Sequence, residues 1–358
     1  MAESECVRSM INYVKARCVL QPSTSSSFLY EHMDSQSCRA LPVVYVPFDP
    51  SKRGHWRDRG QILDFAVSAG GGRILDFGPG DGWPSLLLSP FVAEMVGVEG
   101  SKHRVETCHD NARRLGVTNV SFVFVPPGDR LPFEDGEFDG VVASSSIEQT
   151  PNPRATLAEL YRVLKPGGRL RMNYESLSWY EGREEQAYWI VEGWPENDAA
   201  SESGSAGGSR HACTDPGSTT RLVLYDRHIK EGRVDQYGLV LNLPPADLRV
   251  LLANALTGAA VHDLLSHVTQ AVTWTTFHPS CRQLLDWLQG VGFRSAFPAH
   301  DGGTFAGKLF DRLPESQRPT TLEGVDAYLR PLVEVVAGLE APADSRPGQW
   351  DPWVTAVK

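Results

Sequence analysis

Residues 73–88 read RILDFGPGDGWPSLLL, and this stretch decides the fold. A short apolar run comes first, Gly78, Gly80 and Gly82 follow at every second position, and Pro84 then precedes a run of leucines. This order predicts a strand, a turn and a helix, because the missing N–H of proline is tolerated in the first turn of a helix. Glycines in such a turn let a ligand approach the backbone and the free N–H groups of the helix N-terminus.

Short β-forming runs alternate with helical ones from Arg73 to Glu175. This alternation predicts an α/β fold with a parallel, doubly wound sheet whose ligand crevice lies at the carboxyl ends of the strands. The clearest helix is capped by Asn152, opened by Pro153 and ended by the KPGG of residues 165–168. Four more strands are expected, at residues 94–100, 119–125, 138–144 and 169–175.

The pattern divides the chain into four parts: an N-terminal helical segment (1–60), a Rossmann-like core (61–175), an insertion (176–277) and a C-terminal part that completes the sheet (278–358). The last part is expected to hold a helix with a sixth strand after it, and a helical stretch at residues 322–339. WVTAVK (353–358) is expected to be the antiparallel seventh strand, in preference to GTFAGKLF (303–310). Inside the insertion, the runs at 221–229 and 233–243 are expected to form a hairpin, and the Gly/Ser-rich tract at 197–220 is expected to be flexible.

Composition excludes several classes of protein. A net charge of −10 without a block of Lys and Arg argues against a nucleic-acid partner. The N-terminus lacks the pattern of a secretory signal, and the longest apolar run is interrupted before it could span a bilayer, so a cytoplasmic protein is expected. Six scattered cysteines without a C-x-x-C pair, and histidine pairs at 103/109 and 262/267 that are not four residues apart, indicate no metal site.

The spacing of the glycines argues against a nicotinamide dinucleotide. The dinucleotide fold requires G-x-G-x-x-G, and Trp83 stands where the third glycine belongs. A large ring at that position would prevent the close packing of helix and strand. A nicotinamide-dependent dehydrogenase is therefore a disfavoured alternative.

Two segments carry a family resemblance. LDFGPGDG (75–82) is similar to the D-x-G-x-G-x-G signature of class I S-adenosylmethionine-dependent methyltransferases. LPFEDGEFDGVVASSSIEQTPNPRATLAELYRVLKPGGRL (131–170) resembles the small-molecule branch that includes the ubiquinone and menaquinone C-methyltransferases. The likeness is good over residues 73–174, faint in LLDWLQGVGF (284–293) and absent from the insertion. It implies methyl transfer from S-adenosylmethionine to a small molecule.

The resemblance implies a role for individual residues. Glu99, at a strand end, would accept both ribose hydroxyls, Asp76 would order the glycine loop and face the methionine end, and Asp129 would meet the adenine amino group. The residues assigned to the cofactor are Asp76, Gly78, Pro79, Gly80, Gly82, Trp83, Glu99, Gly100, Ser101, Asp129, Arg130, Ser144 and Ser145.

Structural explanations compete with these roles. Trp83 would border the sulfonium or belong to the core, Asp129 would bind adenine or form a turn, and Ser144 and Ser145 would be ordinary loop residues. Glu99 would be a surface acid, and Asp76 would only cap its turn. No catalytic residue is predicted, because spacing fixes none of the candidate bases, which are His55, Glu148, Tyr174, His228 and His278, and Gln149 stands where relatives often have histidine.

The acceptor is expected between the strand ends and a cover formed by the N-terminal segment and the insertion. The aromatic load of residues 173–194 suggests a bulky small molecule, aromatic or lipidic, although core packing explains these rings equally well. The alternative function is a protein of this fold that binds S-adenosylmethionine without transferring its methyl group. The methylated atom type and the oligomeric state stay open at this point.

Overall fold

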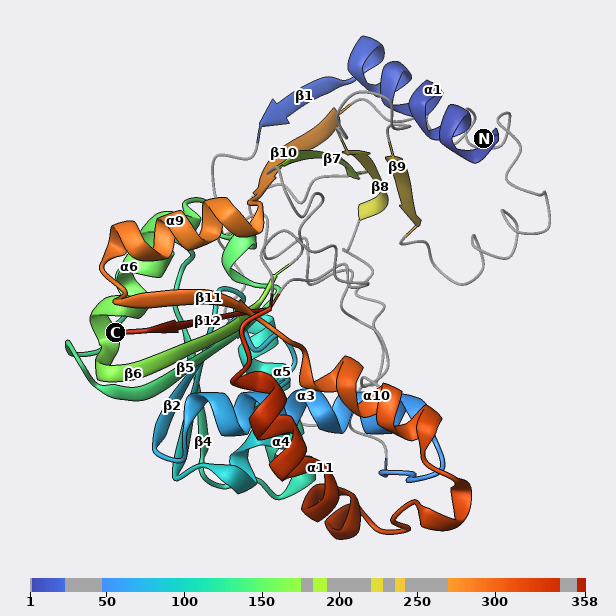
Figure 1. Cartoon of the computed structure of the whole chain (residues 1–358). Helices are drawn as coiled ribbons and strands as arrows, with labels where there is room; N and C mark the ends of the chain where they lie inside the picture. Colours follow the sequence, from blue (N-terminus) through green and yellow to red (C-terminus); the bar gives the residue numbers. More distant parts are fainter. Residues whose placement is uncertain are drawn as a thin grey trace, which may run out of the picture. The chain divides into compact units, whose positions relative to one another are not determined.

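The computed structural model describes residues 2–22, 47–174, 183–191, 220–227, 236–241, 270–341 and 353–358. The chain divides into two compact units, residues 1–39 with 184–277 and residues 40–183 with 278–358. Each unit has its own sheet (Figure 1).

The larger unit, residues 40–183 with 278–358, is built on a seven-stranded sheet in the order β11-β12-β6-β5-β2-β3-β4. Five strands run parallel: β2 (Arg73–Phe77), β3 (Glu94–Glu99), β4 (Val120–Phe124), β5 (Phe138–Ser144) and β6 (Leu164–Asn173). β12 (Trp353–Val357) runs antiparallel to both β6 and β11 (Ser295–Ala299). The predicted Rossmann-like sheet of seven strands is confirmed. Its winding reverses at β2, where ligand crevices of such sheets lie.

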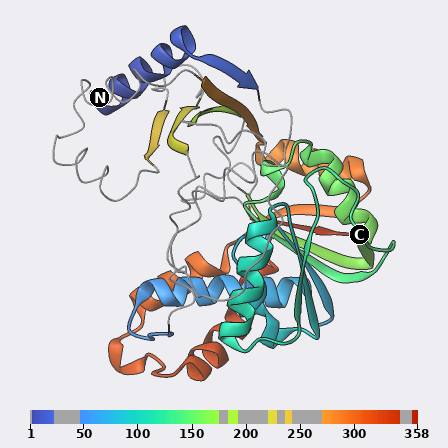
Figure 2. The same ribbon diagram turned by 180° about the vertical axis from the view of Figure 1, so that it is seen from behind.

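Helices cover both faces of this sheet, as Figure 1 and Figure 2 show. One face carries a core cluster to which α6 and α9 contribute leucines, and the other packs against Phe65 and Ala66 of α3. The helices of this unit are α3 (Arg53–Ala69), α4 (Ser85–Leu88), α5 (Lys102–Leu115), α6 (Pro153–Val163), α9 (Cys281–Val291), α10 (Gly302–Arg312) and α11 (Leu322–Ala337), with short 3₁₀ turns η2 (Ser89–Phe91), η3 (Ile147–Gln149) and η4 (Glu315–Gln317).

One element differs from the sequence-based prediction. Helix α6 ends at Val163 and β6 begins at Leu164, so KPGG lies inside the strand instead of closing the helix. The rejected alternative, GTFAGKLF, is part of helix α10, whose small residues allow a close contact with α3. A Cβ on Gly60 would come within 2.5 Å of the carbonyl oxygen of Gly302. The seventh strand is therefore WVTAV, as expected.

The boundary predicted at residue 60 lies within helix α3. Helix α3 crosses it and belongs to the larger unit, whereas α1 (Ala2–Arg17) and β1 (Val19–Pro22) join the insertion in the smaller one. The smaller sheet has the order β1-β10-β7-β8-β9, with β1 parallel to β10. Its other strands are β7 (Arg183–Val191), β8 (Thr220–Arg227), β9 (Gln236–Leu241) and β10 (Gln270–His278).

The predicted hairpin is present as β8 and β9, which pair antiparallel and are joined through residues outside the described set. Helix α1 lies against these two strands and buries Met10, Ile11 and Val14. The tract predicted to be flexible lies outside the described residues up to residue 219. In the parts of the chain that the structure describes, no helix has both the length and the apolar character needed to cross a bilayer.

Candidate functional site

The glycine turn has the conformation that its sequence predicts. The φ angles of Gly78, Gly80 and Gly82 are +77°, +62° and +108°, a region that side-chain-bearing residues rarely adopt. The N–H of Gly82 donates to the carbonyl of Pro79 at 2.8 Å and closes the turn. The N–H of Gly78 donates to Val98 of the adjacent strand at 2.9 Å, so the turn stays in register with the end of β3.

Glu99 ends β3, and its carboxylate is held against this turn. Its Oε2 accepts the N–H of Gly80 at 2.9 Å, and its Oε1 accepts the N–H groups of Gly100 and Ser101 at 2.9 and 3.2 Å. Only 2% of the residue is exposed. Burial raises the pKa of Glu99, while the nearby charge of Arg104 and the three N–H donors oppose that rise. The surface-acid explanation for Glu99 is therefore wrong.

Asp76 lies fully buried near the end of β2. Its Oδ2 accepts from the hydroxyl of Ser85 at 2.6 Å and from its backbone N–H at 3.2 Å, whereas Oδ1 has no hydrogen-bond partner among the described residues. Burial, opposed by Ser85 and reinforced by the charge of Glu99, raises the pKa of Asp76 to about 7. A buried carboxylate oxygen without a partner is costly, and a ligand with a donor group would satisfy it.

The charged groups around the turn favour one sign of charge on a ligand. Asp76, Asp81 and Glu99 surround it, and burial raises the pKa of each of these carboxyl groups. Arg104 is the cation whose charge opposes this rise at Asp81 and Glu99. A pyrophosphate placed here would meet like charges, whereas a cationic group would be attracted.

Trp83 follows the turn and packs on the core. Its ring makes an edge contact with Phe65, with centroids 5.9 Å apart, and it lies against the cluster on the α3 face. The indole Nε1 is buried and has no hydrogen-bond partner among the described residues. The structure thus places the partly buried Trp83 against the core and leaves one buried donor beside the turn.

Three serines lie at the end of β5, next to β2: Ser144 is the last residue of the strand, and Ser145 and Ser146 follow it. Ser144 is half-buried, and Ser145 has φ +48° and donates its N–H to the carbonyl of Asn173 at 3.0 Å. The hydroxyl of Ser146 donates to the carbonyl of Phe77 at 2.6 Å. Non-glycine residues in the left-handed region cluster at functional sites, and Ser145 is the one found among the described residues.

Gly100 and Ser101 are ordered by the start of helix α5. The hydroxyl of Ser101 accepts the N–H of Arg104 at 3.2 Å and caps the helix. Asp129 and Arg130 lie instead on an exposed turn, where the N–H of Asp129 donates to Pro126 at 3.1 Å. Arg130 is 3.8 Å from Asp135 in an ion pair in which both side chains are largely exposed. A contact of Asp129 with adenine stays a prediction.

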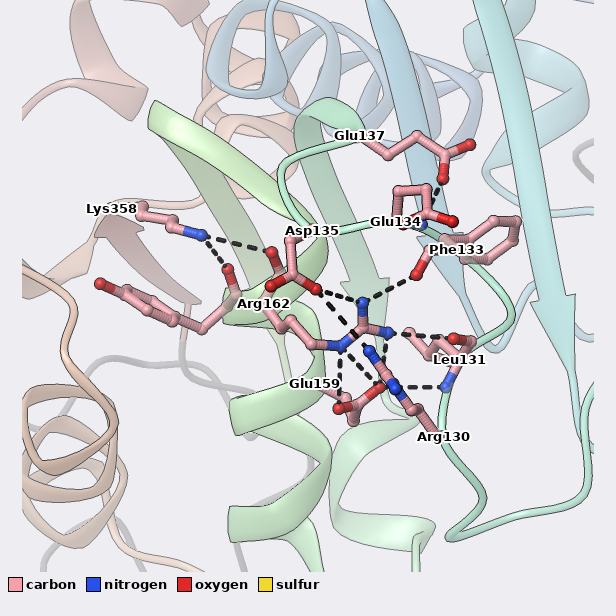
Figure 3. Close-up of polar contacts among 10 residues, drawn as sticks. Arg130, Leu131, Phe133, Glu134, Asp135, Glu137, Glu159, Arg162 and Lys358 are labelled. Carbon is pink, nitrogen blue, oxygen red and sulfur yellow. Dashed lines mark hydrogen bonds and ion pairs between the residues drawn. The ribbon is translucent and has the colours of Figure 1, made fainter.

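The two motif halves 131–140 and 159–168 form one hydrogen-bonded unit, drawn in Figure 3. The guanidinium of Arg162 donates to the carbonyls of Leu131 and Phe133 at 3.0 and 2.7 Å, and Glu159 accepts the N–H of Leu131 at 3.0 Å. Lys358 donates to the carbonyl of Tyr161 at 2.7 Å, which ties the last strand to the end of α6. Arg162 therefore fixes the loop that leads from the exposed turn into β5.

None of the candidate bases is assigned by the geometry. His55 uses its Nδ1 to accept the backbone N–H of Asp49 at 2.8 Å. Glu148, Tyr174 and His278 are buried, and burial raises the pKa of Tyr174 well above its ordinary value. His228 lies outside the described residues.

Sequence reasoning missed Ser85 and Asn173. Ser85 is the partner of Asp76, and its place directly after Pro84, at the start of the helix, was the available signal. Asn173 pairs with Ser144 across β5 and β6 and has a buried Oδ1 without a hydrogen-bond partner among the described residues. Its role depends on the pairing of β6 with β5, so the sequence around Asn173 contains no local pattern that could reveal it.

Comparison with known proteins finds a match to a family model over part of the chain. Residues 75–172 match the family model described as a methyltransferase domain. The chain is 35% identical over 112 residues to the uncharacterized methyltransferase YcgJ of Bacillus subtilis, which covers 31% of this chain and 44% of the relative. It is 42% identical over 101 residues to the demethylmenaquinone methyltransferase of Clavibacter sepedonicus, covering 28% of this chain and 40% of the relative.

Among solved structures, the crystal structure of the 4+2 cyclase SpnF matches 96% of this chain and 99% of its own, at 17% identity and a TM-score of 0.44. The matches to the two curated relatives span less than half of their length. The family-model match, residues 75–172, includes the glycine turn, Glu99 and Arg162.

Proposed function

We propose, because residues 75–172 match the methyltransferase domain model, that the chain transfers the methyl group of S-adenosylmethionine to a small-molecule acceptor. When bound, S-adenosylmethionine supplies a methyl group on a positively charged sulfur. The protein has to hold donor and acceptor in line, which can contribute about 7 to 11 kcal/mol to the lowering of the barrier.

The observation that supports this proposal best is the set of carboxylates around the glycine turn. Glu99, fixed by three backbone N–H groups, retains lone pairs that can accept the ribose hydroxyls. The unpartnered Oδ1 of Asp76 suits the ammonium group at the methionine end. S-Adenosylmethionine carries a positive sulfur and no phosphate, so it fits this charge pattern where a dinucleotide does not.

The remaining cofactor contacts belong to the same proposal. The backbone of Gly78, Pro79, Gly80 and Gly82 would line the nucleoside, together with Trp83, Gly100 and Ser101. Ser144 and Ser145 would face the methionine end, and Asp129 and Arg130 would lie at the adenine end. These positions follow the resemblance, and the geometry above supports them most directly at Asp76 and Glu99.

The acceptor in this proposal is a bulky aromatic or lipidic molecule. Parts of the N-terminal segment and of the insertion, the two segments expected to cover it, belong to one compact unit, residues 1–39 with 184–277, which supports a common role for them. A cytoplasmic location and the lack of a nucleic-acid partner stay predictions from the sequence.

Calorimetry with S-adenosylmethionine and S-adenosylhomocysteine tests cofactor binding. We expect wild type to bind both, and Glu99→Gln to weaken binding by about tenfold or more, as loss of a charge-assisted hydrogen bond requires. Glu94→Gln is the matched control, because Glu94 starts the same strand and pairs with Arg73 at 3.3 Å. Equal losses in the two variants would contradict the assignment of Glu99.

A second measurement separates transfer from binding alone. Purified protein incubated with S-adenosylmethionine and cell extract should generate S-adenosylhomocysteine, because an acceptor in the extract consumes the methyl group. Binding without any such product would favour a protein of this fold that does not transfer methyl. Thermal stabilisation by NADH and none by S-adenosylmethionine would favour the dehydrogenase instead.

A further inference from the structure

Helix α5 presents a row of side chains to the glycine turn. Arg104, Cys108 and Asn111 follow one another at spacings of four and three residues, so they lie on one face of the helix. Cys108 and Asn111 are buried, with 0% and 3% of each residue exposed. The resemblance assigns none of the three to the cofactor.

Two members of the row bind consecutive carbonyls of the turn. The thiol of Cys108 donates to the carbonyl of Gly80 at 3.3 Å, and the amide Nδ2 of Asn111 donates to the carbonyl of Asp81 at 2.8 Å. The guanidinium of Arg104 lies close by, 3.9 Å from the point that a Cβ on Gly80 would occupy. Helix α5 thus holds the turn at successive peptide groups.

These contacts extend to Glu99 through a single residue. Gly80 accepts from Cys108 with its carbonyl and donates its N–H to the Oε2 of Glu99 at 2.9 Å. Glycine has few steric limits on its φ and ψ angles, and the peptide groups on either side of it are planar. The two hydrogen bonds together therefore set the orientation of Gly80. A turn released from α5 would move the N–H that holds the carboxylate.

We propose that Cys108 and Asn111 are positioning residues for the nucleoside. Their hydrogen bonds from helix α5 hold the glycine turn in place and, through Gly80, orient the carboxylate of Glu99. This inference rests on the proposed function. Neither side chain touches the cofactor in this arrangement. Their effect on affinity is transmitted by the backbone of Gly80 and Asp81.

The chain offers a matched control at Asn119. Its Nδ2 donates to the carbonyls of Ser89 and Val92 at 2.9 and 3.2 Å, so it too ties a loop by an amide-to-carbonyl hydrogen bond. That loop lies before β3 and contributes no residue to the turn. Loss of Asn119 should therefore cost stability alone.

The experiment compares five proteins by calorimetry with S-adenosylhomocysteine and by thermal midpoint without ligand: wild type, Asn111→Ala, Cys108→Val, Cys108→Ser and Asn119→Ala. We expect Asn111→Ala and Cys108→Val each to weaken S-adenosylhomocysteine binding by about fivefold to tenfold. Cys108→Ser should bind as wild type does, because its hydroxyl can donate to the same carbonyl. Asn119→Ala should lower the midpoint and leave affinity within about twofold.

A lower midpoint with wild-type affinity in Asn111→Ala and Cys108→Val would overturn the inference, and so would an equal loss of affinity in Asn119→Ala. Both results leave wild-type binding, and hence the proposed function, in place. A wild type that binds neither S-adenosylmethionine nor S-adenosylhomocysteine, in the calorimetry described under the proposed function, would remove that function and this inference with it. If Asn111→Ala does not fold, the comparison of Cys108→Val with Cys108→Ser decides by the same criterion.

Discussion

Ser146 occupies the space that a side chain on Gly78 would need. A Cβ built on Gly78 would lie 2.4 Å from the Cβ of Ser146, and the Ser146 hydroxyl is held by the carbonyl of Phe77 at 2.6 Å. Two independent reasons therefore require glycine at position 78. Its φ is +77°, and Ser146 fills the space that a side chain would need.

Gly78→Ala should destabilise the protein and abolish cofactor binding. The left-handed backbone alone costs about 1 to 2 kcal/mol for a residue with a Cβ, and the clash with Ser146 adds to it. Urea unfolding and calorimetry measure the two effects. Gly116→Ala is the control, because Gly116 has φ +68° with open space around its missing Cβ, and a loss as large as that of Gly78→Ala would contradict the role of Ser146.

Asp76→Asn should raise stability at alkaline pH and weaken cofactor binding. The pKa of Asp76 is raised to about 7, so the folded chain favours its protonated form, and its contribution to stability is lost as the pH rises through that value. The thermal midpoint of Asp76→Asn should exceed that of wild type at about pH 8.5 and match it near about pH 5.

Asp139→Asn is the control, because the pKa of Asp139 is lowered where that of Asp76 is raised. Lys165 and the N–H of Arg73 lower the pKa of Asp139, so its contribution is present at neutral pH and lost as the pH falls through the lowered pKa. A midpoint of Asp76→Asn that stays below wild type throughout the alkaline range would contradict the prediction for Asp76.

Arg162→Lys should destabilise the loop between the exposed turn and β5. A lysine cannot reproduce the donors that bind Glu159, Leu131 and Phe133 together. We expect a loss of about 1 to 3 kcal/mol and faster hydrogen exchange over residues 131–138. Arg113→Lys, at an exposed ion pair with Asp110, should change stability by less than about 0.5 kcal/mol. Similar losses in both variants would contradict the role of Arg162 in holding residues 131–133.

Asp64→Ala should be among the most destabilising single changes, and adding Arg171→Met should recover much of the loss. Arg171 is fully buried, its Nε and Nη2 donate to the two oxygens of Asp64 at 2.7 and 2.8 Å, and its Nη1 donates to Thr355 at 2.8 Å. Removing one partner of a buried pair costs about 3 to 5 kcal/mol, because the other charge is left uncompensated. Strictly additive losses in a double-mutant cycle would refute the coupling.

Local patterns predicted the central part of this chain well. The Asn152 cap is present, with its side chain accepting the N–H of Ala155 at 3.1 Å, and Gly116 ends α5 in the left-handed conformation. Glycine conformations, helix caps and strand periodicity are set by neighbours in the sequence, so they can be read there.

Contacts between distant residues were beyond these patterns. KPGG resembles a helix stop but continues β6, since pairing of Leu164 with Phe138 outweighs local propensity. Cys108 and Asn111, the partners of the glycine turn, carry no signature, because their role depends on which helix face meets the turn. The joining of the N-terminal segment to the insertion depends likewise on strand pairing between β1 and β10.

The sequence by itself determined the strand, turn and helix at residues 73–88, the parallel alternation that follows, and the acid at the end of the second core strand, all of which depend on spacing along the chain. Only the tertiary structure decided that Asp76 keeps an unpartnered oxygen, that Gly80 joins Glu99 to α5, and that residues 1–39 belong with 184–277. Hydrogen bonds and burial act on atoms brought together by folding, and sequence separation does not limit them.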